Sequence, residues 1–277
     1  MSSPDPKIID LISQSNGGKP FLSLEYFPPR TDDGVKVGRW MDPSLSEAGF
    51  PAFLAALVFM DSTVLPVFIY FLFILDSQNL QSRMDRMRET LQPTFSDITW
   101  GAGGSTAGLS MDLALYMKRT GHVANLHMTC TNLQGETDPK GAIYQALQTA
   151  HAGGIRNIVA LRGDPPAGQA EWKASEGGFT CALDLVQFIR EKFGSDFGIA
   201  VAGYPEGHPN AISEIADPST LSETEQKRAS TFDGKTYCCL DADYKKEMDY
   251  LKQKVDAGGG RCMHVYACCV FSMNRNS

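Results

Sequence analysis

One carboxylate, Glu25, lies inside an apolar run that ends at two consecutive prolines. Residues 21–27 are rich in Leu, Phe and Tyr and predict a short buried strand, which Pro28 and Pro29 cannot extend as a hydrogen-bonded ladder. An ionised carboxylate in a strand buried on both faces is unfavourable unless it is paired or takes up a proton. Glu25 is therefore expected either to pair with a base such as Arg30 or to hold a proton for transfer, and the residues alone leave both interpretations open.

Four further predicted strands carry polar side chains where they meet the next loop. These side chains are Thr99, His127 with Thr129, Arg162 with Asp164, and Tyr204 with His208. The Gly-Asp-Pro-Pro corner at 163–166 would hold its acid rigidly, and the loop at 204–209 offers an aromatic ring and an imidazole to a flat or anionic ligand. Taken singly, His127 is more typical of a core histidine with satisfied hydrogen bonds.

The elements that would position these residues alternate regularly along the chain. Apolar side chains recur at helical spacing, and short apolar runs between these segments predict strands. The predicted helices cover 79–91, 106–120, 138–153, 180–193 and 241–257, and the predicted strands cover 21–27, 95–100, 123–130, 155–161 and 197–202. Asp138 and Pro139 stand in the N-cap and N1 order that begins a helix.

This alternation predicts a parallel sheet with helices on its faces, in an α/β fold. A (β/α) barrel and a doubly wound open sheet both satisfy the pattern. An open sheet concentrates its ligand groups at one switch point, whereas a barrel gathers the carboxyl ends of all its strands at one mouth. Polar groups at the ends of five consecutive strands therefore favour the barrel.

Bulk composition limits the function. The chain has 277 residues, 43% of them hydrophobic, and a net charge of −7, which suits one barrel-sized domain and argues against a nucleic-acid-binding protein. Its seven cysteines form no C-x-x-C pair and no metal-ligand spacing, so no metal site is predicted. The odd cysteine count and the lack of a signal peptide indicate reduced thiols in an intracellular compartment. Residues 1–20 are polar and predict a flexible N-terminal arm.

Residues 50–75 are almost continuously apolar and are long enough to cross a bilayer. Asp61 lies near the middle of this run and Pro66 interrupts it. An acid at the centre of a membrane helix costs about 3 kcal/mol even on a lenient scale. Membrane attachment through this segment is therefore disfavoured, and it stays open as an alternative.

Six motifs then make the chain recognisable. They are Leu-Glu-Tyr-Phe-Pro-Pro-Arg (24–30), Asp-Ile-Thr-Trp-Gly-Ala-Gly-Gly-Ser (97–105), His-Met-Thr-Cys (127–130), Leu-Arg-Gly-Asp-Pro-Pro (161–166), Ala-Gly-Tyr-Pro-Glu-Gly-His-Pro (202–209) and Lys-Val-Asp-Ala-Gly (254–258). In this order they closely resemble methylenetetrahydrofolate reductase of the eukaryotic type, over residues 19–36 and 79–258. The resemblance implies a (β/α)8 TIM barrel that holds FAD at its C-terminal mouth. It also implies reduction of 5,10-methylenetetrahydrofolate to 5-methyltetrahydrofolate with NAD(P)H in the cytoplasm, and it leaves open whether the protein is a homo-oligomer.

The same resemblance implies roles for single residues. Glu25 matches the general acid that helps open the methylene-bridged folate ring, and Asp164 matches an acid that tunes the flavin and orients the substrate. The implied FAD contacts are Thr99, His127, Arg162, Tyr204, His208, Glu247 and Lys254. For Lys254 this replaces the usual interpretation of a helical lysine as part of a solvated face.

Two segments depart from the family pattern. Residues 37–78 separate stretches that are nearly adjacent in the family, and Val37 and Gln78 can be encoded with the GT and CAG that bound a spliceosomal intron. We therefore expect an intron-derived insertion, from a retained intron or a gene-model error, within a partial barrel domain at 21–258. Residues 259–277 are expected to be a tail outside the family pattern.

The expected result is an incomplete barrel of about five βα units, without strands six to eight and without the S-adenosylmethionine-binding regulatory domain of the family. Unpaired strand edges would then make the chain poorly soluble. Three hypotheses follow: a folate-reducing flavoenzyme, an inactive truncated or mis-spliced fragment of one, or a protein attached to a membrane through residues 50–75.

Overall fold

A computed structural model of the protein describes most of the chain outside the apolar segment. The described residues are 3–14, 23–26, 80–100, 107–130, 138–163, 174, 176–204, 206–258 and, for the backbone only, 263–267. The predicted insertion and the apolar run at 50–75 lie outside these residues, as does most of the predicted C-terminal tail. Within the described residues, no helix is both long and apolar enough to cross a membrane.

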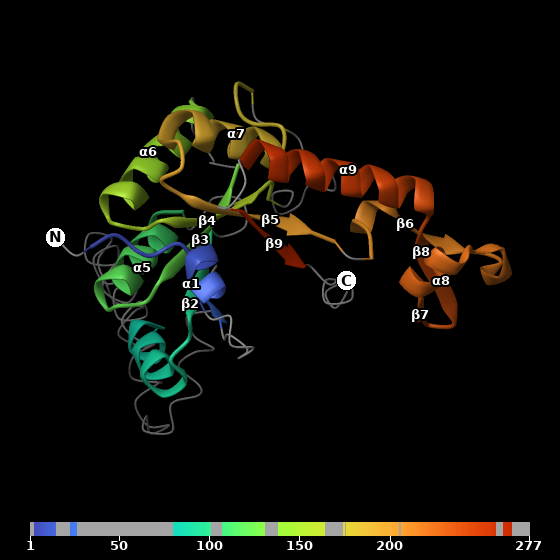
Figure 1. Ribbon diagram of the computed structural model, residues 1–277, viewed down its shortest axis with the longest axis horizontal. Helices are drawn as coiled ribbons and strands as arrows, with labels where there is room; N and C mark the ends of the chain where they lie inside the picture. The colour runs from blue at the N-terminus through green and yellow to red at the C-terminus, as the bar shows by residue number, and fades with distance from the viewer. Residues whose placement is uncertain are drawn as a thin grey trace, which may run out of the picture.

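The centre of the molecule is a six-stranded sheet in which every strand pair is parallel (Figure 1). In spatial order its strands are β1 (Ser23–Tyr26), β2 (Phe95–Thr99), β3 (Ala124–Thr129), β4 (Asn157–Leu161), β5 (Gly198–Gly203) and β9 (Met263–Ala267). Sequential parallel strands joined by helices are the arrangement of a (β/α) barrel, here incomplete. The five predicted strands are confirmed. The sixth, β9, lies in the segment that the sequence analysis assigned to a tail.

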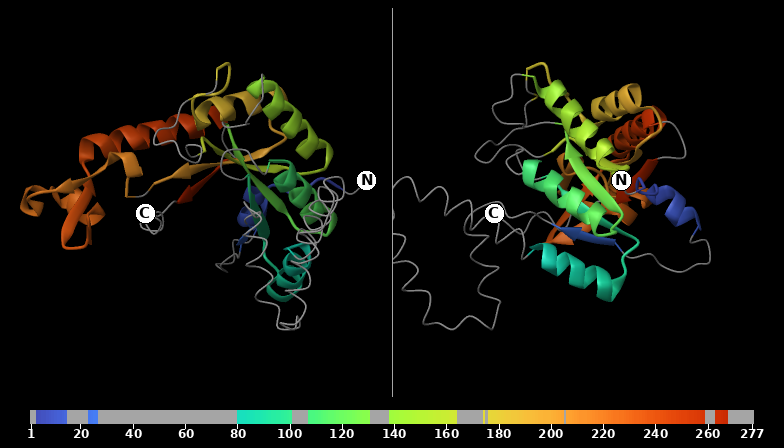
Figure 2. Two further views of the ribbon diagram at one scale, coloured as in Figure 1. Left: turned by 180° about the vertical axis from the view of Figure 1, so that it is seen from behind. Right: turned by 90° about the vertical axis from the view of Figure 1, so that its left-hand side faces the viewer.

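Helices cover one face of this sheet (Figures 1 and 2). They are a helix at 80–91, α5 (Ala107–Arg119), α6 (Pro139–Ala152), α7 (Ala182–Phe193) and α9 (Asp241–Gly258). Each agrees with its predicted range to within two residues. At the start of α6 the predicted cap is present, since the Asp138 carboxylate accepts a hydrogen bond from the Gly141 amide at 3.0 Å.

Alternation along the strands separates an apolar face from a polar one. Ile98, Leu126 and Ile158 point to the helices and are fully buried in one continuous hydrophobic core with side chains of α5, α6 and α7. The next residues along the strands point to the opposite face, which would be the inside of a closed barrel. That inner face carries the polar groups described below.

The N-terminal segment packs against the amino ends of the strands. It contains α1 (Ile8–Gln14), and Ile8 is 2% exposed. The Ile8 amide donates to the Asn157 side chain at 2.9 Å, and the Asp5 carboxylate forms an ion pair with Lys118 at 3.0 Å. A flexible arm was expected over residues 1–20 from their polar composition. Residues 3–14 are instead held by these contacts, because buried polar groups in β4 and α5 require partners.

A second, antiparallel sheet lies at the far end of α9, away from the parallel sheet (Figure 1). Its strands are β6 (Ile212–Ile215), β8 (Lys235–Cys239) and β7 (Ser230–Phe232), in that spatial order. The helix α8 (Glu223–Arg228) packs beside them, and the 3-10 turns η2 (Pro209–Ala211) and η3 (Pro218–Thr220) lead into β6 and α8. This unit was not predicted from the sequence, because its strands are short and only partly apolar.

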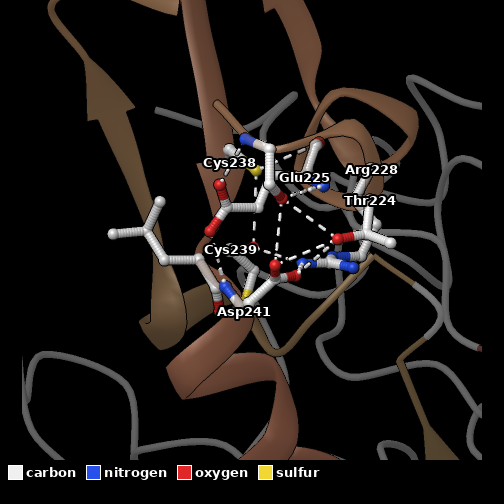
Figure 3. A network of polar contacts seen from close by, with 8 residues as sticks. Thr224, Glu225, Arg228, Cys238, Cys239 and Asp241 are labelled. Atoms are coloured by element: carbon white, nitrogen blue, oxygen red, sulfur yellow. Dashed lines mark hydrogen bonds and ion pairs between the residues drawn. The ribbon is translucent and has the colours of Figure 1, made fainter. Parts of the chain in front are cut away.

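A polar network joins this unit to the start of α9 (Figure 3). Ser222 and Glu225 form a capping box at α8, in which the Glu225 amide donates to the Ser222 hydroxyl at 3.1 Å. Asp241 at the start of α9 accepts from the Ser222 and Thr224 hydroxyls and is paired with Arg228. The network therefore holds the small sheet to the helix that reaches back to the barrel.

Candidate active site

A row of polar side chains crosses the inner face of the parallel sheet. The register pairs Glu25 with Asp97, Asp97 with Asn125, and Asn125 with Asn157, so these four residues share one row. The row begins near the carboxyl end of β1 and reaches the first residue of β4, as the stagger of a barrel requires. Thr99 and His127 are paired in the next row toward the mouth.

His127 lies between two carboxylates. Its Nε2 atom is 2.9 Å from Oδ1 of Asp97, and its Nδ1 atom is 3.6 Å from Oε1 of Glu25. The side chain of His127 is 12% exposed and that of Asp97 is 4% exposed, whereas that of Glu25 is 44% exposed. The histidine is thus buried between an inner, fully covered acid and an outer, accessible one.

The exposure of Glu25 corrects one expectation. Glu25 was expected in a strand buried on both faces, but β1 is the edge strand of the described sheet, and its inner face opens to solvent. The residue that faces the carboxylate is His127, while Arg30 lies outside the described residues. Partial burial still raises the pKa of Glu25; His127 acts against this rise, and the nearby Asp97 adds to it.

A second cluster forms where α9 crosses the carboxyl end of β5. Lys254 is 6% exposed, and its ammonium group donates to the Ala202 carbonyl at 2.8 Å and lies 4.7 Å from the centre of the Tyr250 ring. Burial lowers the pKa of Lys254, and Glu247 on the same helix opposes this change. Lys254 is therefore an interior cation, which overturns the solvated-face interpretation.

His208 connects this cluster to the loops after β4 and β5. Its ring lies edge-on to Tyr204, with 4.7 Å between the ring centres, and its Nδ1 atom accepts from the Asn210 amide at 3.1 Å. Burial lowers the pKa of His208; Glu247 raises it, and Arg162 and Lys254 lower it by charge repulsion. The ring contact with Tyr204 and the charge interactions with Arg162, Glu247 and Lys254 thus centre on His208. All five residues were predicted from the sequence.

Gly207 determines the shape of the loop between Tyr204 and His208. Its φ angle is +101°, and a Cβ atom at this position would lie 2.5 Å from Cβ of Cys239. Only glycine fits both the backbone conformation and the space. The adjacent Glu206 has a buried Oε2 atom that lacks a hydrogen-bond partner within the described part of the chain. It is an acceptor that a ligand hydroxyl could satisfy.

The donor set of this cluster fits a dinucleotide. An ammonium group carries three N–H donors, and Lys254 gives one of them to Ala202, so two remain for an anion such as a diphosphate. Arg162 adds a second cation, and the unpartnered Glu206 oxygen suits a ribose or ribityl hydroxyl. Within the described residues, no group of three His, Cys, Asp or Glu side chains could hold a metal ion.

Some site residues were missed and one lies outside the described residues. Asp164 is the residue outside the described part of the chain, so its predicted role stays a prediction. Asp97 and Asn125 were given no role, although Asp97 stands two residues before Thr99 and so shares its face of the strand. That period-two spacing was the available signal.

Comparison with known proteins agrees with this architecture. The family model described as methylenetetrahydrofolate reductase matches residues 75–264, which is more than half of the chain. The chain belongs to the methylenetetrahydrofolate reductase family. It is 39% identical over 254 residues to methylenetetrahydrofolate reductase (NADH) 1 of Zea mays, and 35% identical over 257 residues to methylenetetrahydrofolate reductase 2 of Saccharomyces cerevisiae.

These alignments cover 91% of this chain but only 31% and 30% of the two relatives, so the chain spans about a third of their length. A more distant relative, the probable methylenetetrahydrofolate reductase (NADPH) of Caenorhabditis elegans, is 31% identical over 244 residues, which are 86% of this chain and 25% of that protein. The names of these family members therefore include both nicotinamides. The family-model match begins at residue 75, near the end of the predicted insertion (37–78), and does not include Glu25.

Proposed function

We propose that this chain carries the catalytic machinery for flavin-dependent reduction of 5,10-methylenetetrahydrofolate to 5-methyltetrahydrofolate by NAD(P)H. The observation that carries the proposal is the placement of Glu25. In a chain of this family, a carboxyl group with a pKa raised by burial stands at the barrel mouth beside His127. Such a group keeps its proton to higher pH than an ordinary glutamic acid and can donate it to a substrate nitrogen. We assign the reaction to the cytoplasm by the same family likeness.

Lys254, Arg162 and His208 would hold the FAD diphosphate, with Tyr204, Glu247 and Thr99 around them. FAD, when bound, supplies the chemistry that takes hydride from a nicotinamide and passes it to the folate. The buried ammonium of Lys254 supports this assignment, because an interior cation that has no carboxylate hydrogen bond among the described residues is suited to an anionic ligand. Asp164 is proposed to orient the folate, by family likeness.

The pH dependence of the folate-dependent step follows from the raised pKa of Glu25. Burial raises its folded-state pKa, so the acid form persists to higher pH than in an ordinary glutamic acid. The proton-donating fraction falls as the pH rises through this raised pKa. The folate-dependent step should therefore slow with increasing pH, while hydride transfer from the nicotinamide, which needs no proton from Glu25, should not follow that titration.

Separate half-reactions test this proposal. The full chain is loaded with FAD, reduced with NADH or with NADPH, and then mixed with 5,10-methylenetetrahydrofolate while the flavin absorbance is followed. Glu25→Gln should leave the reduction intact and slow the folate-dependent reoxidation by about 10²- to 10⁴-fold, the usual contribution of a general acid. Glu214→Gln, which removes an exposed acid paired with Lys235 in the small sheet, is the matched control.

Two results would overturn the proposal. A purified chain that stays colourless after FAD loading would indicate an inactive fragment. Reoxidation of Glu25→Gln at the wild-type rate would show that Glu25 is not the proton donor.

A further inference from the structure

Asp97 is the most deeply buried acid among the residues that the structure describes around His127, and neither the FAD site nor the proton transfer proposed above uses it. The residue is 3% exposed, on the inner face of β2. Its Oδ1 atom accepts a hydrogen bond from the Asn125 side-chain amide at 2.6 Å and lies 2.9 Å from Nε2 of His127. Asn125 supplies an N–H donor, so this oxygen acts as an acceptor.

This arrangement determines which nitrogen of His127 carries a proton. An acceptor oxygen at 2.9 Å requires a hydrogen on Nε2. In the neutral imidazole the other nitrogen, Nδ1, then carries a lone pair and is an acceptor. That lone pair faces Oε1 of Glu25 at 3.6 Å, a distance that a small rotation of the exposed Glu25 side chain would bring into hydrogen-bond range.

We propose that Asp97 is a positioning residue that acts through His127 on Glu25. Asp97 holds His127 as the Nε2–H tautomer, and Nδ1 then accepts a hydrogen bond from the protonated Glu25 carboxyl group. This contact selects the rotamer in which the acid faces the mouth. After Glu25 has given its proton to the substrate, a proton taken up from solvent at Nδ1 is donated back to the carboxylate, so the pair returns to its starting state.

The inference rests on the proposed function for its catalytic meaning, but the tautomer itself does not depend on it. Among the described residues, the acids that face His127 from the neighbouring strands are Glu25 on β1 and Asp97 on β2. On the other side, the register partner of His127 in β4 is Val159, which cannot titrate. The two carboxylates are thus the groups to vary.

Nitrogen-15 NMR of the full chain with labelled histidine tests the proposal without folate or nicotinamide. The chain has five histidines, and the His127 signals are assigned by their loss in His127→Gln. In the wild type, His127 should show a protonated Nε2 and an unprotonated Nδ1. Asp97→Asn should abolish this preference and give a mixture of tautomers, whereas Glu25→Gln should keep it.

A second carboxylate–histidine pair in the same chain is the matched control. His151 Nε2 lies 2.8 Å from Oδ2 of Asp196, at the opposite end of the sheet from the mouth. Asp196→Asn should change the His151 signals and leave His127 untouched. Unchanged His151 signals in Asp97→Asn also report that the variant has folded.

Kinetics give the second readout. Asp97→Asn should slow the folate-dependent step about 10- to 100-fold, the effect typical of lost orienting partners, and should shift its pH dependence to lower pH because Asp97 raises the pKa of Glu25. Flavin reduction should be unchanged.

An Nδ1–H tautomer in the wild type, or in Glu25→Gln, would overturn the proposal even if Asp97→Asn fails to fold. So would a folded Asp97→Asn variant with the wild-type tautomer. A chain without reductase activity would contradict the proposed function and leave the tautomer result intact.

Discussion

Lys254 places an ammonium group inside the protein at the carboxyl end of β5, where it binds a backbone carbonyl rather than a carboxylate. A buried charge that has no carboxylate partner among the described residues lowers stability unless a ligand compensates it. Substitution of Lys254 is therefore expected to affect ligand binding and folding stability differently.

Lys254→Met is expected to weaken FAD binding by about 10- to 100-fold, because a charge-assisted hydrogen bond contributes about 1.5–3 kcal/mol. The free energy of unfolding of the ligand-free chain should stay the same or rise. Burial lowers the pKa of Lys254, so the wild type should lose FAD affinity as the pH rises through that lowered value, and the variant should lack this dependence. Equilibrium titration with FAD across pH measures both effects.

Lys252→Met, two residues earlier on α9, is the control. Its side chain is 72% exposed and paired with Asp256, so FAD affinity should be unchanged. Equal losses in the two variants would contradict a specific role for Lys254.

At the scale of elements, the small sheet depends on polar contacts more than on apolar burial. Its buried apolar side chains are few, namely Leu221, Cys238 and Cys239, while Phe232 is 63% exposed. The capping box at Ser222 and the hydrogen bonds to Asp241 supply what the core does not. Local opening of this unit is therefore expected to be easier than opening of the parallel sheet.

Ser222→Ala should destabilise α8 by about 1 kcal/mol, the usual effect of losing an N-cap side chain. Hydrogen exchange of the Glu225 amide, which donates to Ser222, should become roughly fivefold faster. Exchange in β3 and β4 should not change. Ser213→Ala, at an exposed position in β6, is the matched control and should leave the Glu225 amide as it is. Equal acceleration in both variants would mean that the cap is not what stabilises α8.

At the scale of the whole molecule, the N-terminal segment links elements that are far apart in the chain. The Asp5 amide donates to the Gly154 carbonyl at 2.8 Å, and the Asp5 carboxylate accepts from the Ala124 amide at 3.2 Å and pairs with Lys118. Burial raises the pKa of Asp5, and the Lys118 interaction offsets this only in part. The pair therefore affects stability mainly because removing one partner would leave the other charge buried and unpaired.

Asp5→Ala should lower the free energy of unfolding by about 3 kcal/mol, since it leaves the buried ammonium of Lys118 without its partner. In a Lys118→Met background the same change should cost only about 1 kcal/mol, from the unpaired Ala124 amide. Urea unfolding of the four proteins of this double-mutant cycle measures the difference. Asp10→Ala, an exposed acid of the same segment, should have little effect. Equal costs of Asp5→Ala in both backgrounds would rule out the pair as the cause.

Much of the architecture follows from local pattern. The strands β2 to β5 and the helices that cover the parallel sheet could be predicted to within two residues, because hydrophobic period and capping residues such as Asp138 act within a few positions of the chain. The small sheet was missed because three short strands with exposed faces give almost no period to detect. The packing of residues 3–14 was missed because it depends on acceptors and donors far along the chain.

By itself, the sequence determined that polar residues stand at the carboxyl ends of parallel strands, and its motifs identified the family that the comparisons confirm. Only the tertiary structure decided which of these residues meet. Strand register sets Asp97 beside His127 and His127 beside Glu25, and the crossing of α9 over β5 buries Lys254. Strand register and the crossing of α9 over β5 depend on the packing of the entire core and not on neighbouring residues. The local sequence pattern therefore does not predict them.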